Sequence, residues 1–121
     1  MIYVKVYKDL VWCRNIKDKK EGTNSAIEPF TSDRLLIGNF DSAERTLKTG
    51  LKKVYQRSFL LVSPFVVIHP LENIDGGLSQ VEERLLIELS MAAGAQDAIV
   101  WVGHELTDRE VMEKGLAAQS R

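Results

Sequence analysis

Two short runs of consecutive apolar residues, 65–68 (FVVI) and 98–102 (AIVWV), constrain the fold of this chain more than any other feature. Continuous apolar runs are typical of strands that are covered on both faces, as in a parallel sheet. A helical segment lies between the two runs, and the order strand, helix, strand predicts a right-handed crossover with parallel strands. The sequence therefore predicts an α/β fold in which helices pack on a sheet.

The N-terminal part of the chain predicts antiparallel strands. Residues 2–9 alternate apolar and polar side chains, and residues 10–16 continue as a second strand of a tight hairpin. Residues 17–25 (KDKKEGTNS) are polar throughout and have no periodicity, so we interpret them as an exposed loop. Shorter strands are predicted at 26–30 and 35–38. Together with the parallel pair, these strands predict a mixed sheet of the α+β kind.

Three helices begin with the same signal, a capping residue that is followed three positions later by a glutamate. The side chain of the first residue accepts a hydrogen bond from a free amide of the opening turn, and the glutamate reaches back to the cap. Each such cap contributes about 1 kcal/mol. The pairs are Asp41 with Glu44, Ser79 with Glu82, and Thr107 with Glu110. They predict helices at about 42–57, 80–93 and 108–118.

The second and third helices differ in the apolar surface that they offer. The second has so wide an apolar arc that we expect contacts on more than one side, and Gly94 is well placed to end it. The third has only Val111, Met112 and Leu116 to bury, and it contains Gly115. Three side chains at about 1.5–3 kcal/mol each only just outweigh the ordering cost of a short helix. We therefore predict that this helix is a lid of marginal stability. When a partner displaces the helix, these three side chains form an interaction surface.

Composition indicates a single globular domain over residues 1–121, located in the cytoplasm. Hydrophobic residues make up 45% of the chain and charged residues 27%, which are ordinary values for a globular protein. The formal net charge of −1 gives no overall positive field that attracts the chain to nucleic acid. Cys13 is the single cysteine and has no partner for an internal disulfide, which favours a reducing compartment. Because no signal-peptide pattern is present and no apolar run approaches the ~20 residues of a membrane span, we expect no membrane insertion.

The segment 36–102 carries several motifs in a fixed order. It begins with IGNFD at 37–41, its most specific part is LSQVEER at 78–84, and AGA follows at 93–95. These motifs resemble those of the bacterial actin-like rod-shape proteins, the MreB/Mbl family, and residues 1–5 resemble the family's second strand. The resemblance implies part of one actin-like, ribonuclease H-like subdomain. In the family, this subdomain has three antiparallel strands leading into β-α-β and contributes half of a nucleotide cleft.

The chain departs from the family in the parts that bind nucleotide. The first phosphate loop would precede Met1, and the second phosphate loop and the adenosine-binding segment belong to a half of the family's chain that has no counterpart here. Residues 69–77 stand where the family has a short turn. Glu82 aligns with the family's glutamate that orients the attacking water, but this role needs bound phosphate, so we interpret Glu82 as a helix cap. We therefore expect no ATPase activity, no cofactor and no catalytic residue.

Two function hypotheses follow. The first is a non-catalytic interaction module that resembles a truncated actin-like subdomain and binds a protein partner, such as a cytoskeletal polymer that sets cell shape, or pairs with itself. The alternative is a small ligand-binding protein or enzyme whose ligand loop consists of His69, Gly76, Gly77 and His104, because amides before a helix N-terminus attract anions. A concave pocket at the carboxyl ends of the parallel strands would favour this alternative. Two histidines and a distant cysteine are too few for a zinc site, so no metal site is predicted.

Overall fold

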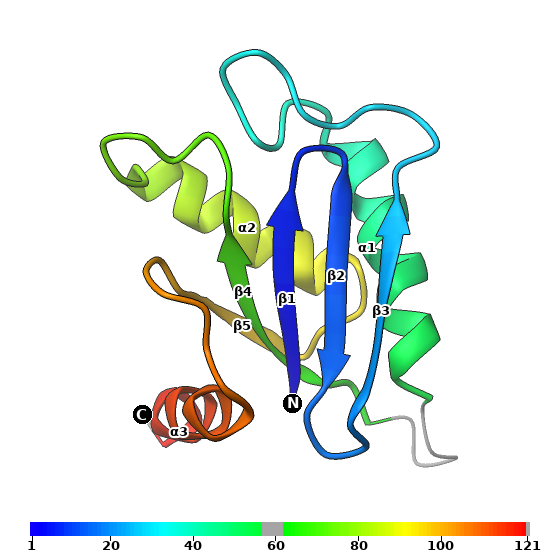
Figure 1. Cartoon of the computed structure of the whole chain (residues 1–121), viewed down its shortest axis with the longest axis vertical. Helices are drawn as coiled ribbons and strands as arrows, with labels where there is room; N and C mark the ends of the chain where they lie inside the picture. The colour runs from blue at the N-terminus through cyan, green and yellow to red at the C-terminus, as the bar shows by residue number, and fades with distance from the viewer. Residues whose placement is uncertain (57–61, 121) are drawn as a thin grey trace.

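The computed structural model describes residues 1–56 and 62–120 of the chain (Figure 1). The elements in these residues are β1 (Ile2–Tyr7), β2 (Leu10–Asn15), β3 (Lys20–Ser25), α1 (Phe40–Val54), β4 (Phe65–Pro70), α2 (Gln80–Ala92), β5 (Asp97–Val100) and α3 (Asp108–Gln119). The strands form one five-stranded sheet in the order β3-β2-β1-β4-β5. Neighbours among β1, β2 and β3 are antiparallel, whereas β4 is parallel to β1 and β5 is parallel to β4. The predicted mixed α/β sheet is confirmed.

The N-terminal hairpin forms as predicted. Its turn consists of Lys8 and Asp9, and Asp9 has a positive φ of 54°, a conformation that aspartate tolerates in turns. The antiparallel register places Tyr7 opposite Leu10. The other edge of β1 pairs with the apolar strand β4, so β1 becomes the central strand of the sheet.

The interpretation of residues 17–25 as a loop is wrong, because Lys20–Ser25 form the edge strand β3. The strand lacks an alternating apolar pattern because the residues that face α1 are small or polar. Gly22 has no side chain, and Asn24 donates a hydrogen bond from Nδ2 to the carbonyl of Thr46 in α1 at 3.0 Å. A polar contact with a helix therefore replaces the apolar contact that would have given a period of two.

The short strands predicted at 26–30 and 35–38 are also wrong, because these residues form an irregular connection. The connection is held to the hairpin turn by Asp9, whose Oδ1 accepts the amides of Phe30 and Thr31 at 2.8 Å each. Phe30 is buried. Phe30, together with the buried Leu36 and Ile37, thus anchors a loop instead of pairing in the sheet.

The helices form layers on both faces of the sheet. Figure 1 shows α1 and α2 behind the sheet and α3 nearly end-on at the lower left, below β5, with nothing drawn in front of β2 and β3. The core between the sheet and the two rear helices includes Val4, Val66 and Leu47. A smaller core under α3, which we call the α3-side core, contains Tyr3, Ile16, Phe65, Val67, Leu106 and Val111. Because β1 and β4 contribute to both cores, they are covered on both faces, as the apolar run of β4 predicts.

Helix α1 approaches the sheet closely at Gly50. A Cβ atom at this position would lie 3.1 Å from Sγ of Cys13 and 3.2 Å from Cγ2 of Val11. The absent side chain lets the helix axis lie close over β2, with the flank of the helix beside β3. This placement leaves a groove between the flank of α1 and the end of β3.

The two capping boxes that open α2 and α3 are confirmed. In each, the side chain of the cap accepts the amide of the glutamate, and the glutamate accepts the amide of the cap. The pairs are Ser79 with Glu82, and Thr107 with Glu110. Gly94 follows the cap that ends α2, with a φ of 120° that suits glycine.

The start of α1 differs from the prediction. The helix begins at Phe40, and its cap is Asn39, whose side chain accepts the amide of Ser42 at 3.1 Å. Asp41 lies in the first turn instead of at the cap. The predicted box of Asp41 with Glu44 is therefore wrong. Asparagine is as good a cap as aspartate, and the helix begins two residues earlier than predicted.

The expectation that α2 is contacted on more than one side is wrong. Its buried residues are Leu86, Leu89 and Ser90, whereas Val81 is 78% exposed and Met91 is 49% exposed. The helix packs on the sheet and α1 with one side, and no described residue covers the other side enough to bury it. Even so, no helix among the described residues is long and apolar enough to cross a membrane.

Candidate functional site

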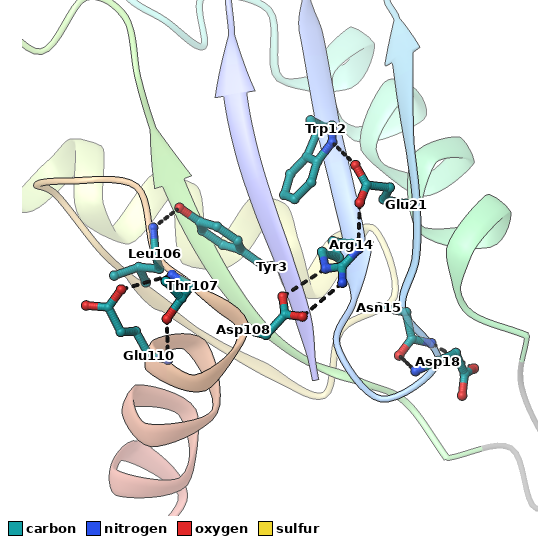
Figure 2. Close-up of polar contacts among 10 residues, drawn as sticks. All are labelled: Tyr3, Trp12, Arg14, Asn15, Asp18, Glu21, Leu106, Thr107, Asp108 and Glu110. Carbon is teal, nitrogen blue, oxygen red and sulfur yellow. Dashed lines mark hydrogen bonds and ion pairs between the residues drawn. The ribbon is translucent and has the colours of Figure 1, made fainter.

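His69, a residue of the predicted ligand loop, lies near the end of β4 and has no exposed surface. Its Nε2 is 3.0 Å from the carbonyl of Gly103, and its Nδ1 is 2.7 Å from the hydroxyl of Tyr3. Because a carbonyl can only accept, Nε2 carries the hydrogen and Nδ1 accepts the hydrogen bond from Tyr3. The Tyr3 hydroxyl in turn accepts the amide of Leu106 at 3.1 Å (Figure 2). Both ring nitrogens of the neutral imidazole are therefore hydrogen-bonded, and burial lowers the pKa of His69.

His104 is exposed on the loop after β5 and is occupied in another contact. Its Nε2 lies 2.9 Å from Oε2 of Glu110, the glutamate of the capping box of α3. The amide of Thr107 and the neighbouring His104 lower the pKa of Glu110 to about 2. Each histidine therefore belongs to its own structural network, and neither belongs to a group of three or more potential metal ligands among the described residues.

The carboxyl end of β4 has a cavity, which borders the loop that leads to α2. Its volume is about 20 Å³, enough for about one water molecule. The lining is mostly leucine, isoleucine and proline, with Glu82 as its charged residue. Gly76 and Gly77 do not line it and lie in an exposed turn. A cavity of this size does not accommodate a small organic ligand.

Glu82 is engaged at the start of α2. Its Oε1 lies 3.2 Å from the amide of Ser79 and 2.9 Å from Oγ of Ser79, and its own amide donates back to that Oγ at 3.1 Å. These contacts satisfy two amides of the helix end that otherwise have no partner within the helix. The geometry gives Glu82 a structural role at this position.

Charged residues hold α3 to the sheet (Figure 2). Arg14 of β2 donates from Nε to Oδ1 of Asp108 at 2.8 Å and from Nη2 to Oδ2 at 2.9 Å. The hydrogen bond from Arg14 lowers the pKa of Asp108. On its other side, Arg14 donates to Glu21 of β3, which also accepts Nε1 of Trp12 at 3.2 Å. The network links α3, β2 and β3, and sequence reasoning missed it because its members lie far apart in the chain.

The apolar side of α3 is smaller than predicted. Val111 is fully buried in the α3-side core and Met112 packs partly against it, but Leu116 is 53% exposed. Gly115 is buried, and a Cβ atom there would overlap the tip of Met1. The three predicted interaction residues therefore do not form one surface while α3 is docked.

The edge of the sheet at β3 is open. The amide of Ala26 donates to the carbonyl of Asp9 at 2.9 Å, which fixes the phase of the ladder between β2 and β3. Alternate residues of an antiparallel strand bond to a given neighbour, so the backbone amides and carbonyls of Glu21, Thr23 and Ser25 point away from β2. No described residue makes a hydrogen bond with these backbone groups.

A groove of about 350 Å³ lies between this edge and the flank of α1, and we call it the β3–α1 groove. The residues that line it are Asn24, Ser25, Ile27, Glu28, Ser42, Arg45, Thr46, Lys48, Thr49 and Lys52. The members from α1 recur at intervals of three and four, so they form one face of the helix. Figure 1 shows α1 running alongside β3, and the residues of β3 that line the groove are the last two, Asn24 and Ser25.

The β3–α1 groove is basic along its helical wall. Arg45, Lys48 and Lys52 are exposed there, and the carboxylate among the lining residues is Glu28, which lies 3.6 Å from Arg45. Lys48 and Lys52 form no ion pair with any described residue. The helical spacing of these cations is visible in the sequence. The strand edge beside them could not be predicted, because the polar pattern of residues 17–25 indicates a loop.

Comparison with known proteins gives one informative relationship. No protein-family model matches the chain. The chain is 36% identical over 100 residues to the uncharacterized protein YjaA of Escherichia coli strain K12, and the alignment covers 78% of this chain and 76% of YjaA. The name of that relative states no activity.

Proposed function

The chain belongs to the YjaA family, and we propose that it is a non-catalytic domain that binds another protein along the open edge of β3. The observation that carries the proposal is the set of unpaired backbone groups of Glu21, Thr23 and Ser25 beside the β3–α1 groove. An exposed edge is a template for pairing with another chain, and proteins usually protect it with proline, bulges or charge. The register of β3 has no bulge. Its charged residues, Lys20 and Glu21, stand at its start, and residues 23–25 (TNS) contain neither proline nor charge.

The residues that sequence reasoning considered for chemistry support a non-catalytic role. Glu82 caps α2, His69 is saturated by Tyr3 and Gly103, and His104 contacts the cap of α3. A general base must reach the substrate through a free lone pair. His69 uses its lone pair to accept the Tyr3 hydroxyl, and its location is fully buried.

The resemblance to the MreB/Mbl proteins supports a narrower form of the proposal. It implies three antiparallel strands that lead into β-α-β, and this chain has β1 to β3, then α1, and then β4, α2 and β5. We propose that the partner is a polymer of actin-like subunits, one of which offers a strand to β3. The cytoskeletal part of this proposal rests on the resemblance alone, whereas the binding edge rests on the geometry.

The single thiol supports a place of action in the cytoplasm, which we also propose. Cys13 is buried and free, and burial raises its pKa to about 12. A thiol with so high a pKa is unreactive. A fold that carries one inert thiol and forms no internal disulfide suits a reducing compartment.

Site-directed crosslinking tests the proposed function. A photoreactive benzoylphenylalanine replaces Ser25 at the open edge or, as the matched control, Glu113 on the exposed side of α3. In native host cells, we expect the probe at position 25 to trap a specific protein and the probe at position 113 to trap none. Trapping at position 113 alone, or no trapping at either position, would overturn the proposal. Magnesium-dependent ATP binding by the purified chain in calorimetry would contradict its non-catalytic part.

A further inference from the structure

We infer that the β3–α1 groove binds an extended acidic segment of the partner, which joins the sheet as a strand beside β3. The inference rests on the proposed function and adds the chemistry of the segment that is bound. In strand addition, main-chain hydrogen bonds supply affinity and the alternating side chains supply specificity. Both halves of this recognition can be derived from the described residues.

The backbone half comes from the phase of the ladder. The amides and carbonyls of Glu21, Thr23 and Ser25 point into the open edge. An extended peptide offers donors and acceptors at the same repeat, so each of these groups can be paired. The sugar-phosphate backbone of DNA offers acceptors to the edge but no donors, so the carbonyls would stay unpaired. The edge therefore favours a polypeptide over DNA.

The side-chain half comes from α1. Alternate side chains of an added strand point to opposite faces of the sheet, so every second one lies on the α1 side. Lys48 and Lys52 line the β3–α1 groove on that side and also line the neighbouring groove toward α2. These lysines are one helical turn apart, about 6 Å along the axis. Side chains on one face of a strand repeat at about 6.6 Å. Two acidic residues at alternate positions of the segment thus match the two lysines.

The end of the groove adds an apolar contact. Ile27, which follows β3, is fully exposed, and it lines the same groove as Lys52. A segment that extends past Ser25 would cover this side chain. We therefore expect an apolar residue in the partner beyond its acidic positions.

A second copy of this chain is a poorer occupant. Two β3 strands that pair antiparallel about a twofold axis normal to the sheet would place both copies of α1 on the same face. Lys48 and Lys52 of one copy would then face the same residues of the other. Like charges across an interface disfavour association. The groove is complementary to an acidic strand and not to itself.

A synthetic peptide provides the probe. It has about eight residues, slightly more than the six of β3, and it alternates glutamate with threonine and valine. Fluorescence anisotropy follows its binding to the full chain at low salt. The matched control has glutamine in place of each glutamate, and a single-stranded DNA of equal charge tests the nucleic acid class. We expect the acidic peptide to bind about twofold to thirtyfold more tightly than the glutamine peptide, the range for two exposed ion pairs.

Variants of the chain assign this binding to the groove. K48Q with K52Q should remove the preference for the acidic peptide, whereas Arg109→Gln, on the exposed side of α3, should leave it unchanged. Thr23→Pro removes an outward amide without touching the ladder to β2, and it should weaken both peptides about tenfold or more. Equal affinity for the two peptides, tighter binding of the DNA, or full binding by T23P would overturn the inference.

Backbone methylation of the peptide gives the same test if T23P does not fold. Methyl groups on one alternate set of amides should abolish binding, and methyl groups on the other set should not, because only one set faces β3. Binding that survives both sets of methyl groups would overturn strand addition. If no peptide binds but the probe at position 25 traps a partner, the proposed function stands and the acidic-strand inference fails. If that crosslink is absent as well, the proposed function itself fails.

Discussion

Arg14 of β2 and Asp108 of α3 are joined by two parallel hydrogen bonds, from Nε to Oδ1 at 2.8 Å and from Nη2 to Oδ2 at 2.9 Å. A fork of this kind fixes orientation as well as distance. It positions the first turn of α3, so that Val111 enters the α3-side core. The helix is therefore docked by charge pairing in addition to its few apolar side chains.

The first prediction tests this docking. Asp108→Asn cannot accept both donors of Arg14, so we expect the amides of α3 to exchange up to about fivefold faster, the scale of a partly exposed ion pair. Hydrogen exchange read by mass spectrometry measures the change. Glu113→Gln is the control, because it breaks the more exposed pair with Arg109 on the same helix. Equal increases of the exchange rate in the two variants would show that the pair of Arg14 with Asp108 stabilises α3 no more than the exposed pair of Arg109 with Glu113.

The second prediction concerns the capping box of α2. Glu82→Ala should lower the free energy of unfolding by about 0.5–1 kcal/mol, because it removes a cap partner and a favourable dipole contact. Urea denaturation measures the loss, and Glu83→Ala, in the same turn but outside the box, should cost less. A Glu82→Ala variant with unchanged stability but lost function would restore a catalytic role for this residue.

The third prediction is that α3 covers surface that the sheet cannot leave bare. A chain that ends at Leu106 exposes the apolar side chains of Phe65 and Val67, which α3 buries through Val111. Large bare apolar patches associate. Light scattering behind a sizing column should show a dimer or a larger species for the shortened chain, and the full chain serves as the reference. A stable monomer would mean that α3 is dispensable to the fold.

The fourth prediction is a pH dependence of stability due to His69. Burial lowers its pKa in the folded chain, so the unfolded chain binds more protons once the pH approaches the ordinary histidine value of about 6.5. The stability from the neutral imidazole is thus complete above this pH and falls as the pH decreases below it, by at most about 1.4 kcal/mol per pH unit. Urea denaturation between pH 7.5 and 5.5 should show this slope in His104→Gln but not in His69→Gln. A slope that persists in His69→Gln would assign it to other groups.

Much of the fold could be predicted from local patterns. The apolar run of β4 predicts a strand covered on both faces, and the boxes at Ser79 and Thr107 predict the starts of two helices within a residue. These features are set by neighbours in the sequence. The start of α1 was misplaced because Asn39 and Asp41 are equally good caps by residue type, and only the packing of the helix selects between them.

The candidate site could not be predicted in the same way. β3 has no apolar period, since Asn24 meets α1 through a hydrogen bond to Thr46 and Gly22 has no side chain. Its pairing is decided by the free edge of β2, which lies outside the segment itself. The basic wall at Lys48 and Lys52 is readable as a helical stripe, but its meaning depends on the strand beside it.

The most direct measurement of the open edge is the amide exchange of β3, followed by NMR in the free chain and with the acidic peptide. In the free chain, the amides of Thr23 and Ser25 should exchange fast, whereas those of Gly22 and Asn24, which bond to β2, should be protected. On addition of the peptide, Thr23 and Ser25 should become protected too. Protection of Thr23 in the free chain, or fast exchange of Thr23 under saturating peptide, would contradict the claim that β3 accepts a strand.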